Sequence, residues 1–246
     1  MARTVVITQS NYIPWRGYFD LIRQADELIL LDSVQYTRRD WRNRNRIKTP
    51  GGPQWLTIPV GSKGAYAQTI DATAIFDPSW AESHVRALEQ NYRRAANFDA
   101  VAPWLFDLLR QAAGRALLSQ VNRFLLEALC PRLGIQVPIR FDREVLPDMD
   151  LTSIDASERL AVLASAVKAS RYISGPAAQA YLDYRPFQQR GIAVQWMDYS
   201  GYRNYPQCWG VFIPNLSIVD LLLNCGDDAA SYLSRDAAIT NGQELA

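Results

Sequence analysis

The sequence has little of what metal sites and disulfide frameworks need. Its 246 residues include one histidine, His84, and three cysteines, Cys130, Cys208 and Cys225, with no paired spacing. A structural zinc site usually takes four such ligands, so we expect no metal. Unpaired cysteines suit a reducing compartment better than a disulfide scaffold, which predicts a cytoplasmic protein with buried, inert thiols. We expect the lone histidine on the surface of a helix.

Long apolar segments are also missing. The longest runs are LILL at 28–31 and IVDLLL at 218–223, whereas a helix needs about 20 apolar residues to cross a bilayer. The first residues lead directly into TVVIT, without the positive flank and long apolar core of a secretory signal. We therefore expect neither membrane insertion nor a secretory signal.

Several common enzyme motifs are absent as well. The sequence contains no GxGxxG, P-loop, HExxH or GxSxG pattern. This argues against the commonest dinucleotide-binding, NTPase and serine-hydrolase classes, and the sequence identifies no cofactor. The 26 basic and 25 acidic residues nearly balance. General wrapping of nucleic acid is therefore not expected, and any such binding would need a local basic patch.

What is present first is the layout of a βαβ unit. Thr4–Thr8 is a β-branched run typical of a buried strand, residues 18–25 have the apolar spacing of a helix, and Leu28–Leu31 predicts a second strand. We therefore predict an α/β fold with a mostly parallel sheet that this unit begins. In such sheets the ligand binds at the carboxyl ends of the strands.

The rest of the chain divides into a hairpin, a helical stretch and a second alternating part. Gly51 and Gly52 predict the bend of a hairpin over 47–60, and residues 78–133 read as helices, with Asp77 as a cap and Pro78 in the first turn. We interpret 78–133 as a helical subdomain inserted within a single α/β domain of residues 1–246. Further strands and helices are expected at 136–141, 157–169, 171–174, 176–184, 192–196 and 216–223.

A basic stretch between residues 34 and 48 is the most informative local feature. It sets six cations against a single acid, Asp40, namely Arg38, Arg39, Arg42, Arg44, Arg46 and Lys48. The guanidinium fork suits phosphate or carboxylate. In a strand, the arginines at 42, 44 and 46 would share one face and form an anion-binding comb beside Trp41. A solvated basic loop and a surface for single-stranded nucleic acid are the alternatives.

Polar residues surround the ends of the first two strands. The amides of Gln9 and Asn11 can hydrogen-bond a sugar or base, and Trp15 can stack on a ring, with Tyr12 beside them. Alternatively, Trp15 packs in the core and Asn11 satisfies the loop backbone. Asp32 ends the second strand and can serve as a base, or as a structural ion pair whose pKa a neighbouring arginine lowers.

Other candidates lie further along the chain. Gln35 follows Asp32 at the same sheet edge, and Ser174 and Gly175 mark a strand-to-helix junction whose N–H groups can face an anion, although a simple turn is the alternative. Gln207 and Asn215 belong to a segment rich in aromatic and amide side chains that can close over the site.

Residues 7–60, ITQSNYIPWRGYFDLIRQADELILLDSVQYTRRDWRNRNRIKTPGGPQWLTIPV, resemble the opening of the WbqC-like family. YISG at 172–175 and YPQCWGVFIPNLSIVDLLLNCG at 205–226 resemble its closing motifs. The likeness follows the family order over most of the chain. Thr8 departs from it, because many members carry a histidine before the glutamine. A mechanism that relies on that histidine does not carry over to this chain.

The resemblance implies a function in bacterial O-antigen or other surface polysaccharide biosynthesis. It points to a transferase that adds an aminoacyl group, such as glycyl, or an acyl group to an amino sugar. The expected partner is an anionic small molecule, most simply a nucleotide-sugar. A nucleotidyltransferase-like enzyme is one alternative, although such enzymes usually carry paired histidines in the first loop. A non-catalytic module that binds anions or RNA is another.

Overall fold

A computed structural model describes residues 2–61, 67–233 and 239–242. Its main sheet has the order β5-β2-β1-β6-β7-β8, in which the first five strands are parallel and β8 is antiparallel to β7. This confirms the α/β fold class with a mostly parallel sheet. The strands are β1 (Thr4–Thr8), β2 (Glu27–Leu30), β5 (Ile139–Phe141), β6 (Arg171–Ser174), β7 (Ala193–Met197) and β8 (Ile239–Asn241).

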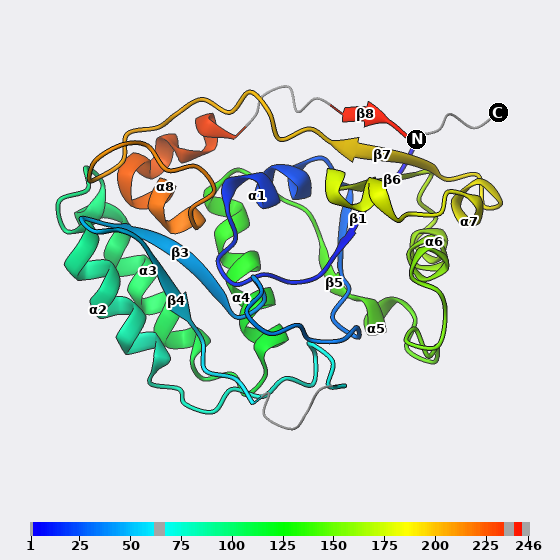
Figure 1. Cartoon of the computed structure of the whole chain (residues 1–246), viewed down its shortest axis with the longest axis horizontal. Helices are drawn as coiled ribbons and strands as arrows, with labels where there is room; N and C mark the ends of the chain where they lie inside the picture. Colours follow the sequence, from blue (N-terminus) through cyan, green and yellow to red (C-terminus); the bar gives the residue numbers. More distant parts are fainter. Residues whose placement is uncertain (1, 62–66, 234–238, 243–246) are drawn as a thin grey trace.

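The predicted βαβ unit begins this sheet. Helix α1 (Arg16–Arg23) connects β1 to β2, which pair in parallel with Val5 opposite Glu27. Alternate residues of β1 face opposite layers, as strand geometry requires. Val6 packs into a core with α1 and the helices at the left of Figure 1, whereas Val5 packs with the helices at its right. The sheet is therefore covered on both faces.

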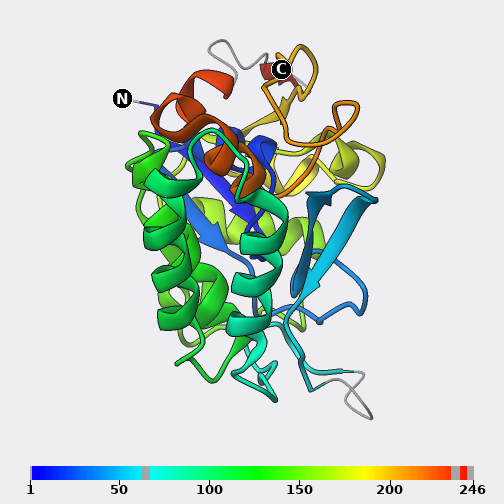
Figure 2. The same cartoon turned by 90° about the vertical axis from the view of Figure 1, so that its left-hand side faces the viewer.

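Three helices occupy the stretch expected to be helical. They are α2 (Trp80–Tyr92), α3 (Phe98–Ala112) and α4 (Leu118–Arg132), and they lie side by side (Figures 1 and 2). The first begins two residues later than expected, because Asp77 accepts hydrogen bonds from both N and Oγ of Ser79 at 2.8 Å. Their apolar faces share one core with β1 and with α8 (Ile218–Cys225).

The hairpin consists of β3 (Arg44–Thr49) and β4 (Gly52–Thr57), which form a separate two-stranded sheet. Gly52 has a φ of +107° at the predicted bend, a value that favours glycine. The hairpin contacts α2 and α8 and lies in front of them in Figure 1. It thus stands beside the carboxyl ends of β1 and β2 without joining their sheet.

Short elements complete the fold. The single helix expected over 176–184 is wrong, because Asp183 accepts a hydrogen bond from the backbone of Arg185 and starts a new turn there. None of the helices in the described residues is long and apolar enough to cross a membrane. The remaining elements are α5 (Asp142–Val145), α6 (Ala156–Ala166), α7 (Arg185–Gln188) and the 3-10 helices η1 (Pro176–Ala180) and η2 (Gly226–Tyr232).

Candidate functional site

The loop after β1 is held in an unusual conformation. Ile13 has a φ of +34°, which a β-branched residue rarely adopts. The buried amide of Asn45 donates to the carbonyl oxygens of Tyr12 at 3.1 Å and Ile13 at 2.9 Å. The hydroxyl of Ser217 also donates to Ile13 O, at 2.7 Å. Strain of this kind persists only where surrounding contacts enforce it, so the loop is shaped without a ligand.

This loop forms one wall of a first cavity with a volume of about 230 Å³. The other walls come from the turn before β3, from β3 itself and from the loop before α8. Two indoles and three asparagines line one space. The amide of Asn45 is used by Tyr12 O, Ile13 O and Arg46 N, so the amides of Asn11 and Asn215 accompany the indoles, an arrangement that suits a sugar ring or a nucleobase. The lining residues are Asn11, Pro14, Trp15, Trp41, Asn45 and Asn215.

Trp15 is half-buried and lies at the start of α1. Its indole meets the rings of Tyr199 and Tyr202 edge-on, with centroids 5.1 and 5.9 Å away. A Cβ added at Gly17 would come within 2.3 Å of the indole, so glycine is needed for this rotamer. Trp15 therefore belongs both to the packed base of α1 and to the cavity wall.

Ser174 and Gly175 end β6, the neighbour of β1 on the side opposite β2. This is the point where strand order reverses, and open α/β sheets bind ligands there. A Cβ added at Gly175 would lie 3.5 Å from the hydroxyl of Tyr199. Because Tyr199 also packs on Trp15, it stands between Ser174–Gly175 and the cavity.

The arginines of the basic stretch do not form one comb. Arg42 precedes β3 rather than lying in it, so the expectation that it shares a strand face with Arg44 and Arg46 is wrong. Its guanidinium donates to Asn11 Oδ1 and lies 3.6 Å from the carboxylate of Asp40. Arg42 therefore does not line the first cavity, but it orients the amide of Asn11, which does.

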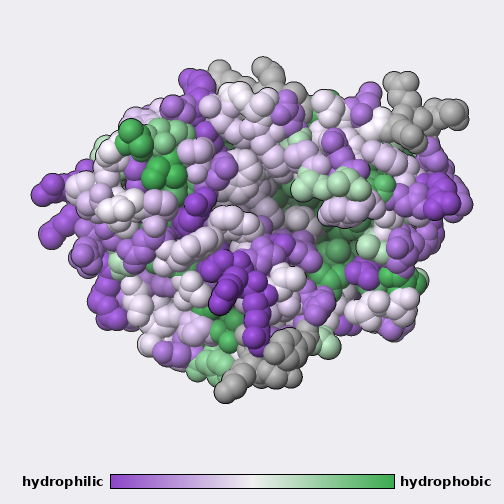
Figure 3. Space-filling view, in the orientation of Figure 1, coloured by the Kyte–Doolittle hydropathy of each residue, from purple (hydrophilic) through white to green (hydrophobic). Residues whose placement is uncertain are grey.

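Arg44 and Arg46 pack instead on a pair of indoles. Arg44 lies 4.1 Å from the ring centroid of Trp55, and Arg46 lies 5.6 Å from that of Trp41. The two rings are 5.3 Å apart. One Nη of Arg44 donates to Arg39 O. Cation–π contacts of this kind leave the remaining outer donors of the two guanidinium groups available to an anion. Figure 3 shows a strongly hydrophilic patch on the same face of the molecule, near its hollowed centre.

The other cations of the basic stretch do not gather with Arg44 and Arg46. Arg38 and Arg39 are exposed in the loop before the hairpin. Lys48 is buried, and its Nζ donates to Gln207 Oε1 at 2.9 Å and to Val211 O at 2.6 Å. Lys48 thus ties the segment before α8 to the hairpin and does not face an open cavity.

Gln207 belongs to the same buried network. Its amide donates to Asp220 Oδ2 at 2.9 Å, and Tyr92 and Tyr205 donate to the two oxygens of that carboxylate at 2.7 and 2.6 Å. Burial raises the pKa of Asp220, and these hydrogen bonds oppose the rise. The network positions the segment that carries Asn215, and the sequence reading missed Asp220 within an apolar helix.

The asparagines of the basic stretch act as internal clamps. Asn43 and Asn45 are buried, and Asn43 donates to Ile58 O at 2.8 Å. In the sequence they alternate with the arginines at 42, 44 and 46. Their alternation was a signal, because residues opposite a solvated strand face point into the protein.

Asp32 is fully buried at the end of β2. Its Oδ1 accepts a hydrogen bond from Ser10 N at 2.8 Å, and its Oδ2 has no hydrogen-bond partner in the described part of the chain. Burial raises the pKa of Asp32 to about 6; hydrogen bonds from Ser10 oppose this and the charge of Asp142 adds to it. Arg42 lowers the pKa as expected, but burial outweighs it.

Asn122 connects this carboxyl group to the first cavity. Its amide donates at 2.9 Å both to Ser10 Oγ and to Arg42 O. Asp32 therefore touches the loop between β1 and α1 through Ser10, and lines neither of the cavities described here.

Gln9 and Gln35 line a second, larger cavity of about 540 Å³. The sequence reading expected one pocket for the loop after β1, Asp32–Gln35 and the arginines. The structure instead places Asn11 in the first cavity and Gln9 in the second. The residues that line the second cavity are Gln9, Val34, Gln35, Ala67, Thr69, Thr152 and Arg159.

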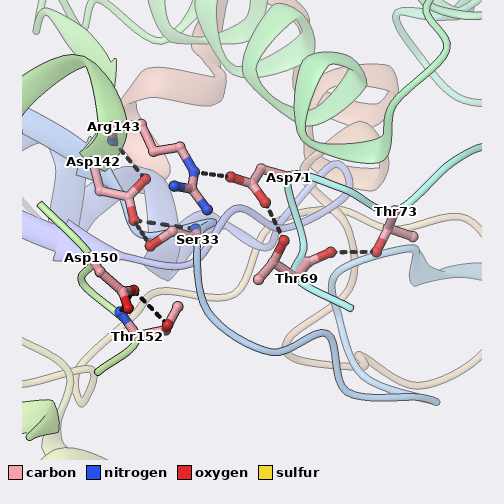
Figure 4. Close-up of polar contacts among 8 residues, drawn as sticks. All are labelled: Ser33, Thr69, Asp71, Thr73, Asp142, Arg143, Asp150 and Thr152. Atoms are coloured by element: carbon pink, nitrogen blue, oxygen red, sulfur yellow. Dashed lines mark hydrogen bonds and ion pairs between the residues drawn. The ribbon is translucent and has the colours of Figure 1, made fainter. Parts of the chain in front are cut away.

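Acidic groups surround the second cavity, each with its own partner (Figure 4). Asp142 is buried and accepts hydrogen bonds from the backbone and hydroxyl of Ser33, and Asp71 accepts from Thr69 and from Arg143 Nε at 2.6 Å. Among the described residues, no three His, Cys, Asp or Glu side chains gather as a metal site.

Tyr12 and His84 face the core. The Tyr12 hydroxyl lies 2.8 Å from His84 Nδ1, and Trp80 packs on both rings. His84 is only 5% exposed, so its expected place on a helix surface is wrong. Burial lowers the pKa of His84 to about 4, so its imidazole is neutral at neutral pH.

Comparison with known proteins places the chain in a family. The model of the WbqC-like protein family matches residues 9–232. A Mycobacterium tuberculosis protein described as uncharacterized protein Rv1507c is 48% identical over 233 residues, which cover 94% of this chain and 97% of that protein. No solved structure matches the chain. The chain therefore belongs to the WbqC-like protein family.

Proposed function

We propose that the first cavity binds the sugar of a nucleotide-linked amino sugar and that the protein transfers an aminoacyl or acyl group to its amine. The observation that carries this proposal is the cavity wall itself, in which the indoles of Trp15 and Trp41 accompany the amides of Asn11 and Asn215. Indole faces suit the apolar face of a sugar ring, and amides suit its hydroxyl groups.

The cations near this cavity support the nucleotide part of the proposal. Arg46 lies beside Trp41 at the cavity rim, and Arg44 follows it across Trp55. Their free donors are suited to the diphosphate of the substrate. Gln9, on the other side of Asn11, opens onto space for a second substrate. The proposed setting is surface polysaccharide biosynthesis in the cytoplasm.

In the proposed reaction the amine nitrogen of the sugar bonds to the acyl carbon of the donor as the bond from that carbon to the carrier breaks. The carrier leaves with the electron pair of the broken bond, and the nitrogen gives up one proton to the carrier or to water. Holding both substrates in line supplies much of the rate in such a transfer. Asp32 is fully buried, so we assign it to positioning the loop between the cavities through Ser10.

The test is calorimetric titration of the protein with nucleotide-linked amino sugars. Trp41→Ala should weaken binding by about 1–3 kcal/mol, the usual worth of a stacked ring. Trp55→Ala is a matched control, because Trp55 is 41% exposed against 39% for Trp41 and does not line the cavity. Trp55→Ala should weaken binding of the nucleotide-sugar clearly less than Trp41→Ala does. Absence of binding to any nucleotide-sugar would overturn the proposal.

A second candidate function rests on the same cluster of arginine and tryptophan side chains. Arg44, Arg46, Trp41 and Trp55 form a surface of the kind that binds single-stranded nucleic acid. This alternative predicts that Trp41→Ala and Trp55→Ala weaken RNA binding equally and that binding falls steeply with salt. Equal losses for RNA, without nucleotide-sugar binding, would favour it.

A further inference from the structure

One wall of the second cavity carries a cation that has no ion-pair partner among the described residues. Arg159 lies in the first turn of α6 and lines the cavity. One Nη of its guanidinium donates to Ile154 O at 3.1 Å. Within residues 2–61, 67–233 and 239–242, none of the ion pairs involves Arg159.

The two acids nearest to Arg159 in the sequence have other partners. Asp155 caps α6 by accepting a hydrogen bond from the backbone of Ser157 at 2.8 Å, and Glu158 pairs with Arg190. A guanidinium group on a cavity wall, with its neighbouring carboxylates engaged elsewhere, is suited to an anion that comes from outside the chain.

Two hydroxyl groups of the same cavity can only accept hydrogen bonds from a ligand. Thr69 donates its proton to Asp71, and Thr152 donates its proton to Asp150 at 2.6 Å (Figure 4). Each hydroxyl oxygen therefore presents only lone pairs to the cavity. Because the proton points to a carboxylate, the oxygen is also a stronger acceptor than an isolated hydroxyl group. A ligand should bring hydrogen-bond donors, such as hydroxyl groups, to these two oxygens.

These features together favour a ligand that has both hydroxyl groups and a negative charge. A neutral sugar would leave Arg159 without an anion, and a simple carboxylate would leave the oxygens of Thr69 and Thr152 without donors. The amide of Gln9 can donate or accept, and Val34 offers an apolar surface to a ring. A ribose that bears a phosphate and a free hydroxyl group meets all of these requirements.

We propose that the second cavity binds the ribose phosphate of a ribonucleotide that carries the acyl group of the donor. Arg159 holds a phosphate oxygen, and the ribose donates hydrogen bonds to the oxygens of Thr69 and Thr152. An acyl-adenylate and a coenzyme A thioester both contain such a group. In both, the phosphate keeps a negative charge while the acyl group is attached, so Arg159 has an anion to hold before and after the transfer. This inference rests on the proposed function and identifies the carrier that leaves.

The position and size of the cavity agree with this role. Its lining residues Gln9 and Val34 follow β1 and β2, so the cavity lies where the parallel strands end, the usual place for nucleotides in open α/β sheets. Its volume of about 540 Å³ compares with about 230 Å³ for the first cavity, as expected for the bulkier ligand group. Asn11, two residues after Gln9, lines the first cavity, so the acyl carbon and the sugar amine would meet across this loop.

The experiment titrates the full chain calorimetrically with AMP, adenosine, 2′,3′-dideoxy-AMP, inorganic phosphate and coenzyme A. Adenosine lacks the phosphate and the dideoxy compound lacks the ribose hydroxyl groups, so each should bind at least about tenfold more weakly than AMP. Binding of AMP without coenzyme A would identify an adenylate carrier, and the reverse would identify a coenzyme A carrier. Binding of neither, or binding of inorganic phosphate as tight as that of AMP, would overturn the inference.

Arg159→Ala should weaken binding of the tighter of AMP and coenzyme A by about 10- to 100-fold, as expected for a charge-assisted hydrogen bond. Binding of adenosine, which has no phosphate, should not change. Arg171→Ala is the matched control, because Arg171 is exposed at the amino-terminal end of β6, opposite to the end near the cavity. Equal losses in both variants would overturn the inference.

Thr152→Val tests the ribose contact on an exposed residue, where folding is little affected. It should weaken binding of AMP by about three- to tenfold and leave binding of 2′,3′-dideoxy-AMP unchanged. Ser153→Ala is its control, because the exposed Ser153 also donates its hydroxyl proton to Asp150, through the backbone oxygen, but does not line the cavity. Equal effects of Thr152→Val on AMP and on the dideoxy compound would contradict a contact with the ribose.

A last titration separates this inference from the proposed function. AMP or coenzyme A should bind protein that is already saturated with a nucleotide-linked amino sugar, and binding of that nucleotide-sugar should survive Arg159→Ala. Displacement of the probe by the nucleotide-sugar would overturn the inference, because one substrate would then occupy both cavities. If the nucleotide-sugar binds but neither probe does, the inference fails while the proposed function stands. If a probe binds through Arg159 but no nucleotide-sugar binds, the proposed function fails and the ribose phosphate site stands.

Discussion

The two cavities differ in chemistry although residues that are close in the sequence line them. Gln9 lines the second cavity and Asn11 lines the first. The first is lined by indoles and amides, and its shape depends on the hydrogen bonds that Asn45 and Ser217 donate to a strained loop. The second is larger and is lined by amides, hydroxyl groups and Arg159, with the ion pair of Asp71 and Arg143 beside it. The difference indicates that one loop separates sites for two unlike ligands.

Asn45→Ala should have the largest effect, because it removes one clamp and leaves the carbonyl oxygens of Tyr12 and Ile13 with fewer donors. We expect the free energy of unfolding to fall by about 2–4 kcal/mol. Asn43→Ala, which frees one carbonyl, should cost about half as much. Chemical denaturation of both variants measures the difference. A smaller loss of stability for Asn45→Ala than for Asn43→Ala would contradict the claim that Asn45 holds the loop after β1 in place.

Asp32 lies between the cavities, and its titration should show in stability. Its pKa is raised to about 6, above the ordinary value, so the folded state binds more protons than the unfolded state between about pH 4 and 6. Stability from this group therefore falls as pH rises through that window, by about 3 kcal/mol for a two-unit rise. Asp142, whose pKa is also raised, acts in the same direction.

The comparison of wild type with Asp32→Asn isolates this contribution. The variant keeps an oxygen that can accept from Ser10 N, but it does not titrate. Denaturation at pH 4 and at pH 7 should show that the variant gains relative to wild type as pH rises. Parallel curves for the two proteins would show that Asp32 is not a buried, titrating carboxyl group.

Arg44→Ala should have the smallest effect of the series. Arg44 is only partly buried and lies on Trp55 outside the first cavity, so its contact with a diphosphate is worth less than about 1 kcal/mol. The loss should shrink further at high salt. Titration with a nucleotide-sugar at two salt concentrations measures it, and a loss as large as that of Trp41→Ala would show that the diphosphate binds mainly at Arg44, away from the rim of the first cavity.

Much of the fold could be predicted because its signals are local. The β-branched run Thr4–Thr8, the helical spacing after Pro14 and the paired glycines at the hairpin bend each depend on a few neighbouring residues. The family resemblance was likewise readable from a continuous stretch, and the match to residues 9–232 confirms it.

The candidate site was harder to predict because it depends on which face of each element packs inward. The alternation of arginine and asparagine in the hairpin directed attention to the charges, whereas Asn45 is the residue that shapes the cavity. Arg159 gave no sequence signal, since its lack of an ion pair within residues 2–61, 67–233 and 239–242 follows from Asp155 and Glu158 having other partners. The pKa of Asp32 depends on burial that no local pattern reports.

A crystal structure with a nucleotide-linked amino sugar tests the central claim most directly. The account predicts that the sugar ring lies against Trp15 or Trp41, that its hydroxyl groups meet Asn11 or Asn215, and that its amine is directed toward Gln9. A ligand seated wholly outside this cavity, for example on the outer face of the hairpin, would contradict the account.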